Sequence, residues 1–153
     1  MKTAVPRARA RRLDELALAL PQRASALTRL FFARTGTGLS RTEVGLLAAL
    51  VAGPRRVTEL AAREGITQPA VTQLVNRLER RGYAERRADP EDGRAVLVVA
   101  TGAGRDALER VRAEYRALLH EEMATLRDDE VEALGRAVEI LDRLLERLGG
   151  RAR

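Results

Sequence analysis

The sequence predicts a mainly helical protein that contains one small β-hairpin. Along most of the chain, apolar residues recur every three or four positions, which is the pattern of amphipathic helices. Two short runs near the middle, Tyr83 to Arg87 and Ala95 to Ala100, are extended instead. The segment Asp89-Pro-Glu-Asp-Gly-Arg94 joins them and has the residue types of tight turns. We therefore expect helices, then a hairpin, then further helices.

Composition limits the class of protein. The chain has 153 residues, enough for one domain with a helical appendage, and its aromatic content of 3% means that aliphatic side chains must fill the core. It has no cysteine, which excludes disulfides, thiolate metal sites and sensing by thiol oxidation. No apolar run is long enough to span a membrane, so we expect a cytoplasmic protein. The net charge of +6 favours a polyanionic partner.

The N-terminal part is expected to hold a basic arm and a helix. Residues 1–12 carry basic side chains without an acid, and we expect them to be disordered. They are either a solvated terminus, which we favour, or an arm that follows a nucleic-acid backbone. Helical spacing runs from Leu13 to about Arg34, and Pro21 inside it predicts a kink or a restart.

Ser40 and Glu43 have the spacing of a capping box, which opens a helix that ends at Ala52 before Gly53-Pro54. The residues expected to point inward from this helix are Val44, Leu47, Ala48 and Val51.

Two short helices around a sharp corner form the centre of the chain. The first is Thr58 to Glu64 and the second is Thr67 to Arg81, with Gly65 in the corner. The second helix has an inward apolar stripe of Val71, Leu74, Val75 and Leu78. Its outward face has no carboxylate and carries Pro69, Gln73, Asn76 and Arg80, flanked by Thr72 and Arg77. Such amides and guanidinium groups suit base edges and phosphates, so we interpret this helix as a recognition helix within a winged helix-turn-helix.

Two longer helices follow the hairpin. Thr101 can cap a helix that runs to about Thr125, and the polar corner Arg127 to Glu130 opens the last helix. The last helix has a heptad seam of Val131, Leu134, Val138, Leu141, Leu145 and Leu148. We expect the N-terminal helix and these two helices to form a bundle with a second chain, with interface residues Leu13, Leu16, Leu134, Leu141, Leu145 and Leu148. The alternative is that the last helix packs only within its own chain.

Four motifs resemble the multiple antibiotic resistance regulator (MarR) family. They are Thr58-Glu-Leu-Ala, Thr67-Gln-Pro-Ala-Val-Thr, Leu78-Glu-Arg-Arg-Gly82 and Asp89-Pro-Glu-Asp-Gly-Arg94, the last of which matches the family's Asp-x-Arg. The resemblance implies a winged helix-turn-helix DNA-binding domain at 37–102 and a helical dimerisation region at 13–36 and 103–150. It further implies a homodimeric transcriptional regulator, more often a repressor, that binds a palindromic operator in double-stranded DNA.

The expected DNA contacts lie on the recognition helix and the hairpin. The candidate DNA-binding residues are Thr67, Gln68, Pro69, Ala70, Thr72, Gln73, Asn76, Arg77, Arg86, Asp92 and Arg94. Gln73 is expected to read an adenine edge, whereas Asn76 and Arg77 are expected to hold phosphate. Arg86 and Arg87 are expected at the DNA backbone. The resemblance implies that Arg94 enters the minor groove and that Asp92 orients it through an ion pair.

The resemblance also implies a small phenolic or anionic effector that weakens DNA binding. The candidate ligand-binding residues are Phe31, Arg34, Tyr115 and His120, although Phe31 and Tyr115 are equally well explained as core residues.

The sequence shows no catalytic set. The single histidine, His120, has neither a nucleophile nor a metal-ligand spacing near it, so we expect no enzyme, no metal and no cofactor. Two other function classes stay open. One is a winged helix that binds a protein partner, and the other is a sequence-neutral DNA-binding protein that relies on phosphate contacts.

Overall fold

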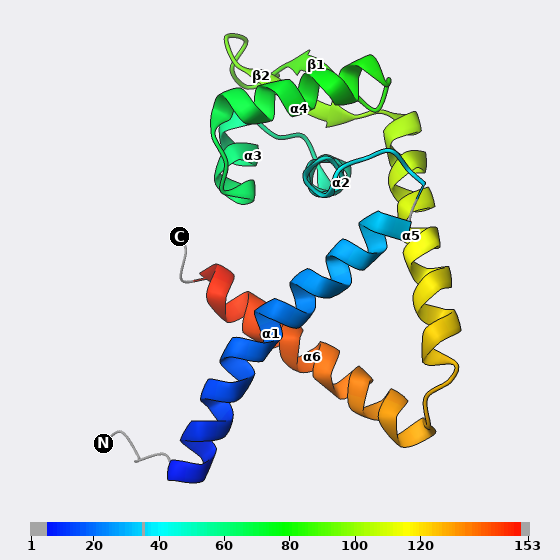
Figure 1. Cartoon of the computed structure of the whole chain (residues 1–153). Helices are drawn as coiled ribbons and strands as arrows, with labels where there is room; N and C mark the ends of the chain where they lie inside the picture. The colour runs from blue at the N-terminus through cyan, green and yellow to red at the C-terminus, as the bar shows by residue number, and fades with distance from the viewer. Residues whose placement is uncertain (1–5, 35, 151–153) are drawn as a thin grey trace. The chain divides into compact units, whose positions relative to one another are not determined.

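The computed structural model describes residues 6–34 and 36–150. Within these ranges the chain forms six helices and two strands (Figure 1). In chain order they are α1 (Arg7–Arg34), α2 (Arg41–Ala52), α3 (Val57–Glu64), α4 (Gln68–Arg80), β1 (Ala84–Ala88), β2 (Val96–Ala100), α5 (Gly102–Met123) and α6 (Asp128–Gly150). The chain divides into two compact units, residues 1–113 and 114–153, so the boundary falls inside α5. The predicted fold class, mainly helical with one hairpin, is confirmed.

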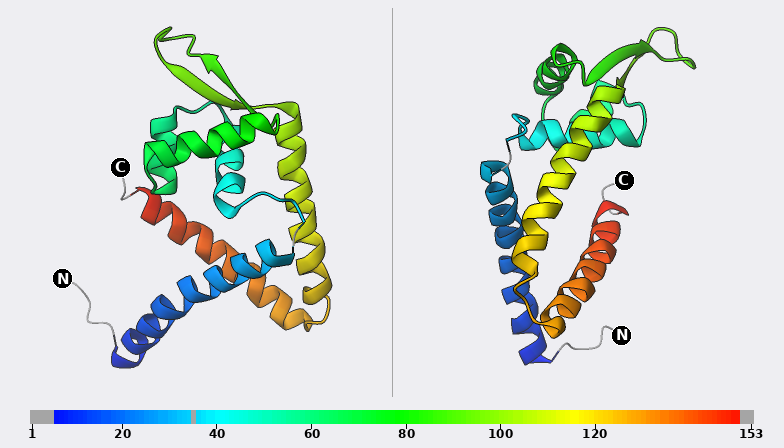
Figure 2. Two further views of the ribbon diagram at one scale, coloured as in Figure 1. Left: turned by 45° about the horizontal axis from the view of Figure 1, so that its top comes forward. Right: turned by 90° about the vertical axis from the view of Figure 1, so that its right-hand side faces the viewer.

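The first unit contains the winged helix-turn-helix. α3 packs on α4, α2 packs on α3 and β2, and α4 packs on β1. The strands are antiparallel, with Ala84 opposite Ala100 and Ala88 opposite Val96. On its other side, β2 forms a short bridge to the segment before α3, where Arg55 and Val98 exchange both backbone hydrogen bonds. The turn of the hairpin extends past the helices (Figure 2).

The recognition helix α4 forms where its local signals place it. The hydroxyl of Thr67 accepts the N–H of Ala70 at 3.4 Å, and Pro69 lies in the first turn, where a missing N–H costs little. Beyond the last turn, Gly82 has a φ of 72°, a conformation that favours glycine. The predicted inward stripe is confirmed, because Val71, Leu74, Val75 and Leu78 are all buried.

The core of the first unit is aliphatic. The largest fully buried side chains are Leu46, Leu47, Leu60, Leu78, Leu108, Val71, Val75, Val98 and Val111. The inward face predicted for α2 is wrong for three of its four residues, since only Leu47 is buried and its neighbours on the core side are Glu43, Leu46, Ala49 and Leu50. α2 has apolar residues on almost every side, so its periodicity does not define a face. Its contacts with α3 and β2 select the face instead.

Helix α1 corrects two expectations. Residues 7–12 belong to this helix and are not disordered, and the acid Glu15 pairs with Arg11 and Arg12 one turn earlier. Residues 1–5 of the expected arm lie outside the described residues. Of the kink or restart expected at Pro21, the restart is wrong because α1 is one helix from Arg7 to Arg34, and the kink stays a prediction. The carbonyl that loses its donor to Pro21 belongs to the exposed Ala17, so water can replace the missing bond.

The second unit is a helical hairpin made of the second half of α5 and α6. The acids Asp128, Asp129 and Glu130 occupy the first turn of α6, as predicted, and the carboxylate of Glu130 accepts the N–H of Arg127 at 3.0 Å. No residue of α6 whose side chain is described is buried. No helix in the described part of the chain has the apolar length that a membrane crossing requires.

Candidate nucleic-acid interface

The N-terminal half of α4 presents free polar groups. Gln68, Pro69 and Gln73 are exposed, and Ala70 and Thr72 are half-buried. Among the described residues, no hydrogen bond to another residue is made by the side chains of Gln68, Thr72 or Gln73. Their donors and acceptors are therefore available to an external partner, and backbone hydrogen bonds of the helix hold them in place.

The C-terminal half of the same face is engaged within the chain. The Nε of Arg77 donates to Oε1 of Glu43 at 3.1 Å. An Nη of Arg86 on β1 donates to Oδ1 of Asn76 at 2.9 Å, and its other Nη contacts the carboxylate of Glu79. Three predicted DNA-binding residues, Asn76, Arg77 and Arg86, thus connect α4 to α2 and β1.

Glu43 is the most deeply buried charged residue of this network, at 4% exposed. Burial raises the pKa of its carboxyl group, but the N–H and hydroxyl of Ser40 and the guanidinium of Arg77 outweigh burial and lower that pKa overall. The carboxylate is therefore ionised at neutral pH. It joins the predicted capping box of α2, which is confirmed, to the recognition helix.

The hairpin turn is built on two aspartates. The carboxylate of Asp89 is mostly buried and accepts an Nη of Arg56 at 2.7 Å, which together with a backbone hydrogen bond lowers its pKa. The carboxylate of Asp92 accepts the backbone N–H of Arg94 at 3.2 Å and lies 3.9 Å from the same Arg56 guanidinium. Arg94 is exposed.

Within the described residues, the expected ion pair between the side chains of Asp92 and Arg94 is not formed in this structure. Two positions before Arg94, an aspartate reaches the backbone N–H more easily than the far end of the arginine side chain, as in an Asx turn. The Asp92 carboxylate pairs with Arg56 instead.

Sequence reasoning missed two residues of this region, Glu43 as a partner of α4 and Arg56 as a partner of the turn. Each bond spans more than 30 positions, 34 from Glu43 to Arg77 and 33 from Arg56 to Asp89. The only local signal was Glu43 itself, an acid at the start of the largely apolar helix α2. The capping box already accounts for an acid at that position, so nothing in the sequence indicated a second partner.

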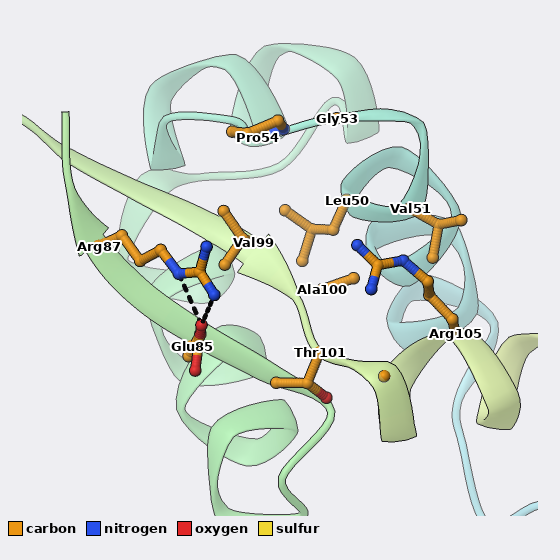
Figure 3. Close-up of a pocket in the computed structure, with 11 residues that line it drawn as sticks. Leu50, Val51, Gly53, Pro54, Glu85, Arg87, Val99, Ala100, Thr101 and Arg105 are labelled. Atoms are coloured by element: carbon orange, nitrogen blue, oxygen red, sulfur yellow. Dashed lines mark hydrogen bonds and ion pairs between the residues drawn. The ribbon is translucent and has the colours of Figure 1, made fainter. Parts of the chain in front are cut away.

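The face of the hairpin away from α4 carries a hollow of about 380 Å³ (Figure 3). It lies between the end of α2, the strands and the start of α5, and its lining includes Leu50, Val99 and Arg105. Because side chains alternate along a strand, Arg87 points into this hollow while Arg86 faces α4. Arg87 bonds to Glu85 there at 2.6 Å, so its predicted contact with a DNA backbone has no support from this orientation.

The predicted ligand residues lie in both units. Phe31 and Arg34 are at the end of α1, and Tyr115 and His120 are in the second half of α5. Phe32, the neighbour of Phe31, lines a hollow of about 530 Å³ between the C-terminal part of α1 and residues 39–41 at the start of α2. The effector site itself stays a prediction.

Comparison with known proteins agrees with this geometry. A model of the MarR family matches residues 37–95, which include the whole helix-turn-helix and the hairpin turn. The regulator YcgE of Bacillus subtilis, named as an uncharacterised helix-turn-helix transcriptional regulator, is 31% identical over 89% of this chain and 93% of its own length. The chain belongs to the MarR family.

Two further comparisons extend over most of this MarR-family chain. The B. subtilis transcriptional repressor YetL is 32% identical over 74% of the chain and 68% of its own length. The structure of a MarR-family protein from Bacillus stearothermophilus covers 94% of the chain and 99% of its own chain with a TM-score of 0.74. At 22% identity, this similarity shows the fold alone. MarR-family members are transcriptional regulators, a class of proteins that are not enzymes.

Proposed function

We propose that the protein is a repressor that binds a palindromic operator in double-stranded DNA as a homodimer. The observation that carries the proposal is the division of α4. Its first half presents unbonded polar side chains, while its second half is fixed to α2 and β1. A surface that is rigid and hydrogen-bonding, yet has no internal partner, suits the edges of bases in a major groove.

The proposal assigns different tasks to the predicted DNA residues. Gln68 and Gln73 read base edges, and Pro69 or Ala70 contacts a thymine methyl group. Thr67 and Thr72 hold flanking phosphates. The exposed part of Arg77, whose side chain is 44% exposed, can still meet a phosphate while its Nε holds Glu43. Arg94 reaches the minor groove from the hairpin turn, and Asn76, Arg86 and Asp92 support these contacts.

Exposed apolar side chains support the homodimer. Within the described residues, neither α1 nor α6 has a buried residue. The predicted interface residues are 38–64% exposed: Leu13, Leu16, Leu134, Leu141, Leu145 and Leu148. So much aliphatic surface on two long helices favours association with a second copy, because each leucine that becomes buried contributes about 1.5–3 kcal/mol. A two-fold axis then presents two α4 helices about 34 Å apart, one turn of DNA.

The proposal includes a small-molecule effector. A small phenolic or anionic molecule that binds near Phe31, Arg34, Tyr115 and His120 is expected to weaken DNA binding. Phe31 and Tyr115 would supply aromatic surface and Arg34 a cationic group, which are the side-chain types that suit such a molecule.

The deciding experiment is fluorescence anisotropy on the DNA directly upstream of the protein's own coding sequence. A scrambled duplex of equal composition is the control, and the salt concentration is about 150 mM because phosphate attraction alone mimics binding in low salt. We expect a preference of about 10³-fold or more for the upstream DNA. Equal binding to both duplexes supports a sequence-neutral DNA-binding protein, and absence of binding supports a protein-interaction module. The same assay screens candidate effectors, and transcription in vitro from the bound promoter tests repression.

A further inference from the structure

The hairpin turn is held by two consecutive residues of the segment before α3. The backbone of Arg55 exchanges hydrogen bonds of 3.0 and 2.8 Å with Val98 on β2. The side chain of Arg56, which directly follows, reaches the turn and bonds to Asp89 at 2.7 Å. The segment before α3 therefore contacts the hairpin twice, through backbone hydrogen bonds to β2 and through an ion pair with the turn.

The charges of the turn explain why the contact between Arg56 and Asp89 matters. Residues 89–94 include three acids, Asp89, Glu91 and Asp92, and only one base, Arg94. Such a turn is repelled by phosphates unless its acids are neutralised. The guanidinium of Arg56 lies 2.7 Å from one of these carboxylates and 3.9 Å from another.

The two carboxylates also shape the backbone on both sides of Arg94. One oxygen of Asp89 accepts the N–H of Glu91 at 3.0 Å, and the N–H of Asp89 donates to the carbonyl of Ala95 at 2.9 Å. An oxygen of Asp92 accepts the N–H of Arg94 at 3.2 Å. The remaining oxygens of both aspartates face Arg56. Arg56 therefore binds both carboxylates that hold the backbone around Arg94 in its conformation.

We propose that Arg56 is a positioning residue that holds the hairpin turn through Asp89 and Asp92 and so sets the place of Arg94 relative to α4. The inference rests on the proposed DNA-binding function for its consequence, but the hold itself exists without DNA. It differs from the simpler role of Arg56 as a direct phosphate contact, in which Arg56 acts independently of the turn.

The first test requires no DNA. The chain has no cysteine, so Gly93→Cys introduces a single site for a spin label at the turn, where no atom other than those of Gly93 and its two chain neighbours lies within 4 Å of an added Cβ. We expect Arg56→Ala and Asp89→Asn each to increase the mobility of the label in the electron paramagnetic resonance spectrum. The control Arg63→Ala removes the same charge from α3, where Arg63 pairs with its neighbour Glu64 and with no other acid in the described part of the chain, and is expected to change nothing. An unchanged spectrum in both Arg56→Ala and Asp89→Asn, with folding verified by circular dichroism, overturns the proposal.

The second test separates positioning from phosphate contact. Arg56→Ala in the wild-type background is expected to weaken operator binding roughly tenfold, and by no more than Arg94→Ala does. In the Arg94→Ala background, Arg56→Ala is expected to have no further effect, because its action runs through Arg94. An additive loss in the double variant means that Arg56 contacts phosphate directly and overturns the proposal. If the wild-type protein fails to bind its DNA, the proposed function fails. The spin-label experiment still tests whether Arg56 restrains the hairpin turn.

Discussion

Helices α4 and α6 both have an apolar stripe at helical spacing, but the stripe of α4 is buried and that of α6 is exposed. The apolar stripe of α4 is 0–7% exposed, since α3, β1 and the rest of the first unit cover it. The apolar seam of α6 is 38–64% exposed along its whole length. Thr67 caps the start of α4, three acids occupy the first turn of α6, and both helices are amphipathic, so the difference does not lie in helix formation.

The difference indicates which interactions stabilise which part of the protein. The winged helix-turn-helix completes its core within one chain, and its stability should not depend on protein concentration. In the proposed dimer a partner surface would cover the seam of α6, so the stability of this part should depend on protein concentration. The polar face of α4 is divided in a similar way. Its C-terminal half is hydrogen-bonded within the chain, and its N-terminal half is free to bind an external partner.

The largest expected effect is on association. Leu141→Asp together with Leu145→Asp places two charges in the proposed interface, where they have no partners, and should convert the dimer to a monomer. Light scattering measures the mass, and circular dichroism should still report a folded winged unit. Arg143→Asp is the matched control, because it changes the net charge by the same −2 on the opposite side of α6 and should leave the dimer intact. A dimeric double variant would refute the seam.

Leucine truncation distinguishes the two helices by stability. Leu78→Ala removes a fully buried side chain from α4 and should lower the free energy of unfolding by about 2–5 kcal/mol at any protein concentration. Leu145→Ala makes the same chemical change where the side chain is 64% exposed. Its loss should be smaller and should vary with concentration. Urea denaturation at two concentrations measures both, and equal losses would contradict the comparison.

The bond between Arg77 and Glu43 should make the stability of α4 depend on pH. The lowered pKa of Glu43 means that its stabilising contribution is complete above its ordinary value of about 4.3 and is lost as the pH falls through the lower pKa of the folded state. Arg77→Met leaves the buried carboxylate short of a partner and should cost about 1–3 kcal/mol at pH 7. The cost should shrink in acid, where Glu43 becomes protonated.

Urea denaturation from pH 7 to well below pH 4, through the lowered pKa of Glu43, measures this dependence. Glu43→Gln is the control, since it keeps an acceptor but removes the titrating group. A cost for Arg77→Met that is the same at both ends of the range would show that Glu43 is not the group responsible.

The smallest expected effect on stability is that of Gln73→Ala. Gln73 is exposed and makes no hydrogen bond within the described chain, so the free energy of unfolding should change by less than about 0.5 kcal/mol. Operator affinity should fall by about 1–3 kcal/mol in the anisotropy assay. The neighbouring Asn76→Ala should lose more stability, because Asn76 bonds to Arg86. A Gln73→Ala variant that binds operator as tightly as wild type would remove Gln73 from the interface.

The sequence by itself determined the features that depend on near neighbours. The capping box of Ser40 and Glu43, the cap at Thr67, the stripe of α4, the hairpin and the acidic start of α6 are all confirmed. Each rests on hydrogen bonds or periodicity within a few residues, and such signals survive in the linear order.

Only the tertiary structure decided which face of α2 is buried and which charges meet. Of the 28 basic residues, all but one are arginines, so any acid has many chemically equal partners in the sequence. The choices of Arg77 for Glu43 and of Arg56 for Asp89 follow from the packing of elements that lie more than 30 residues apart. An ion pair forms where folding brings two groups within about 4 Å, and composition and spacing along the chain do not encode that distance.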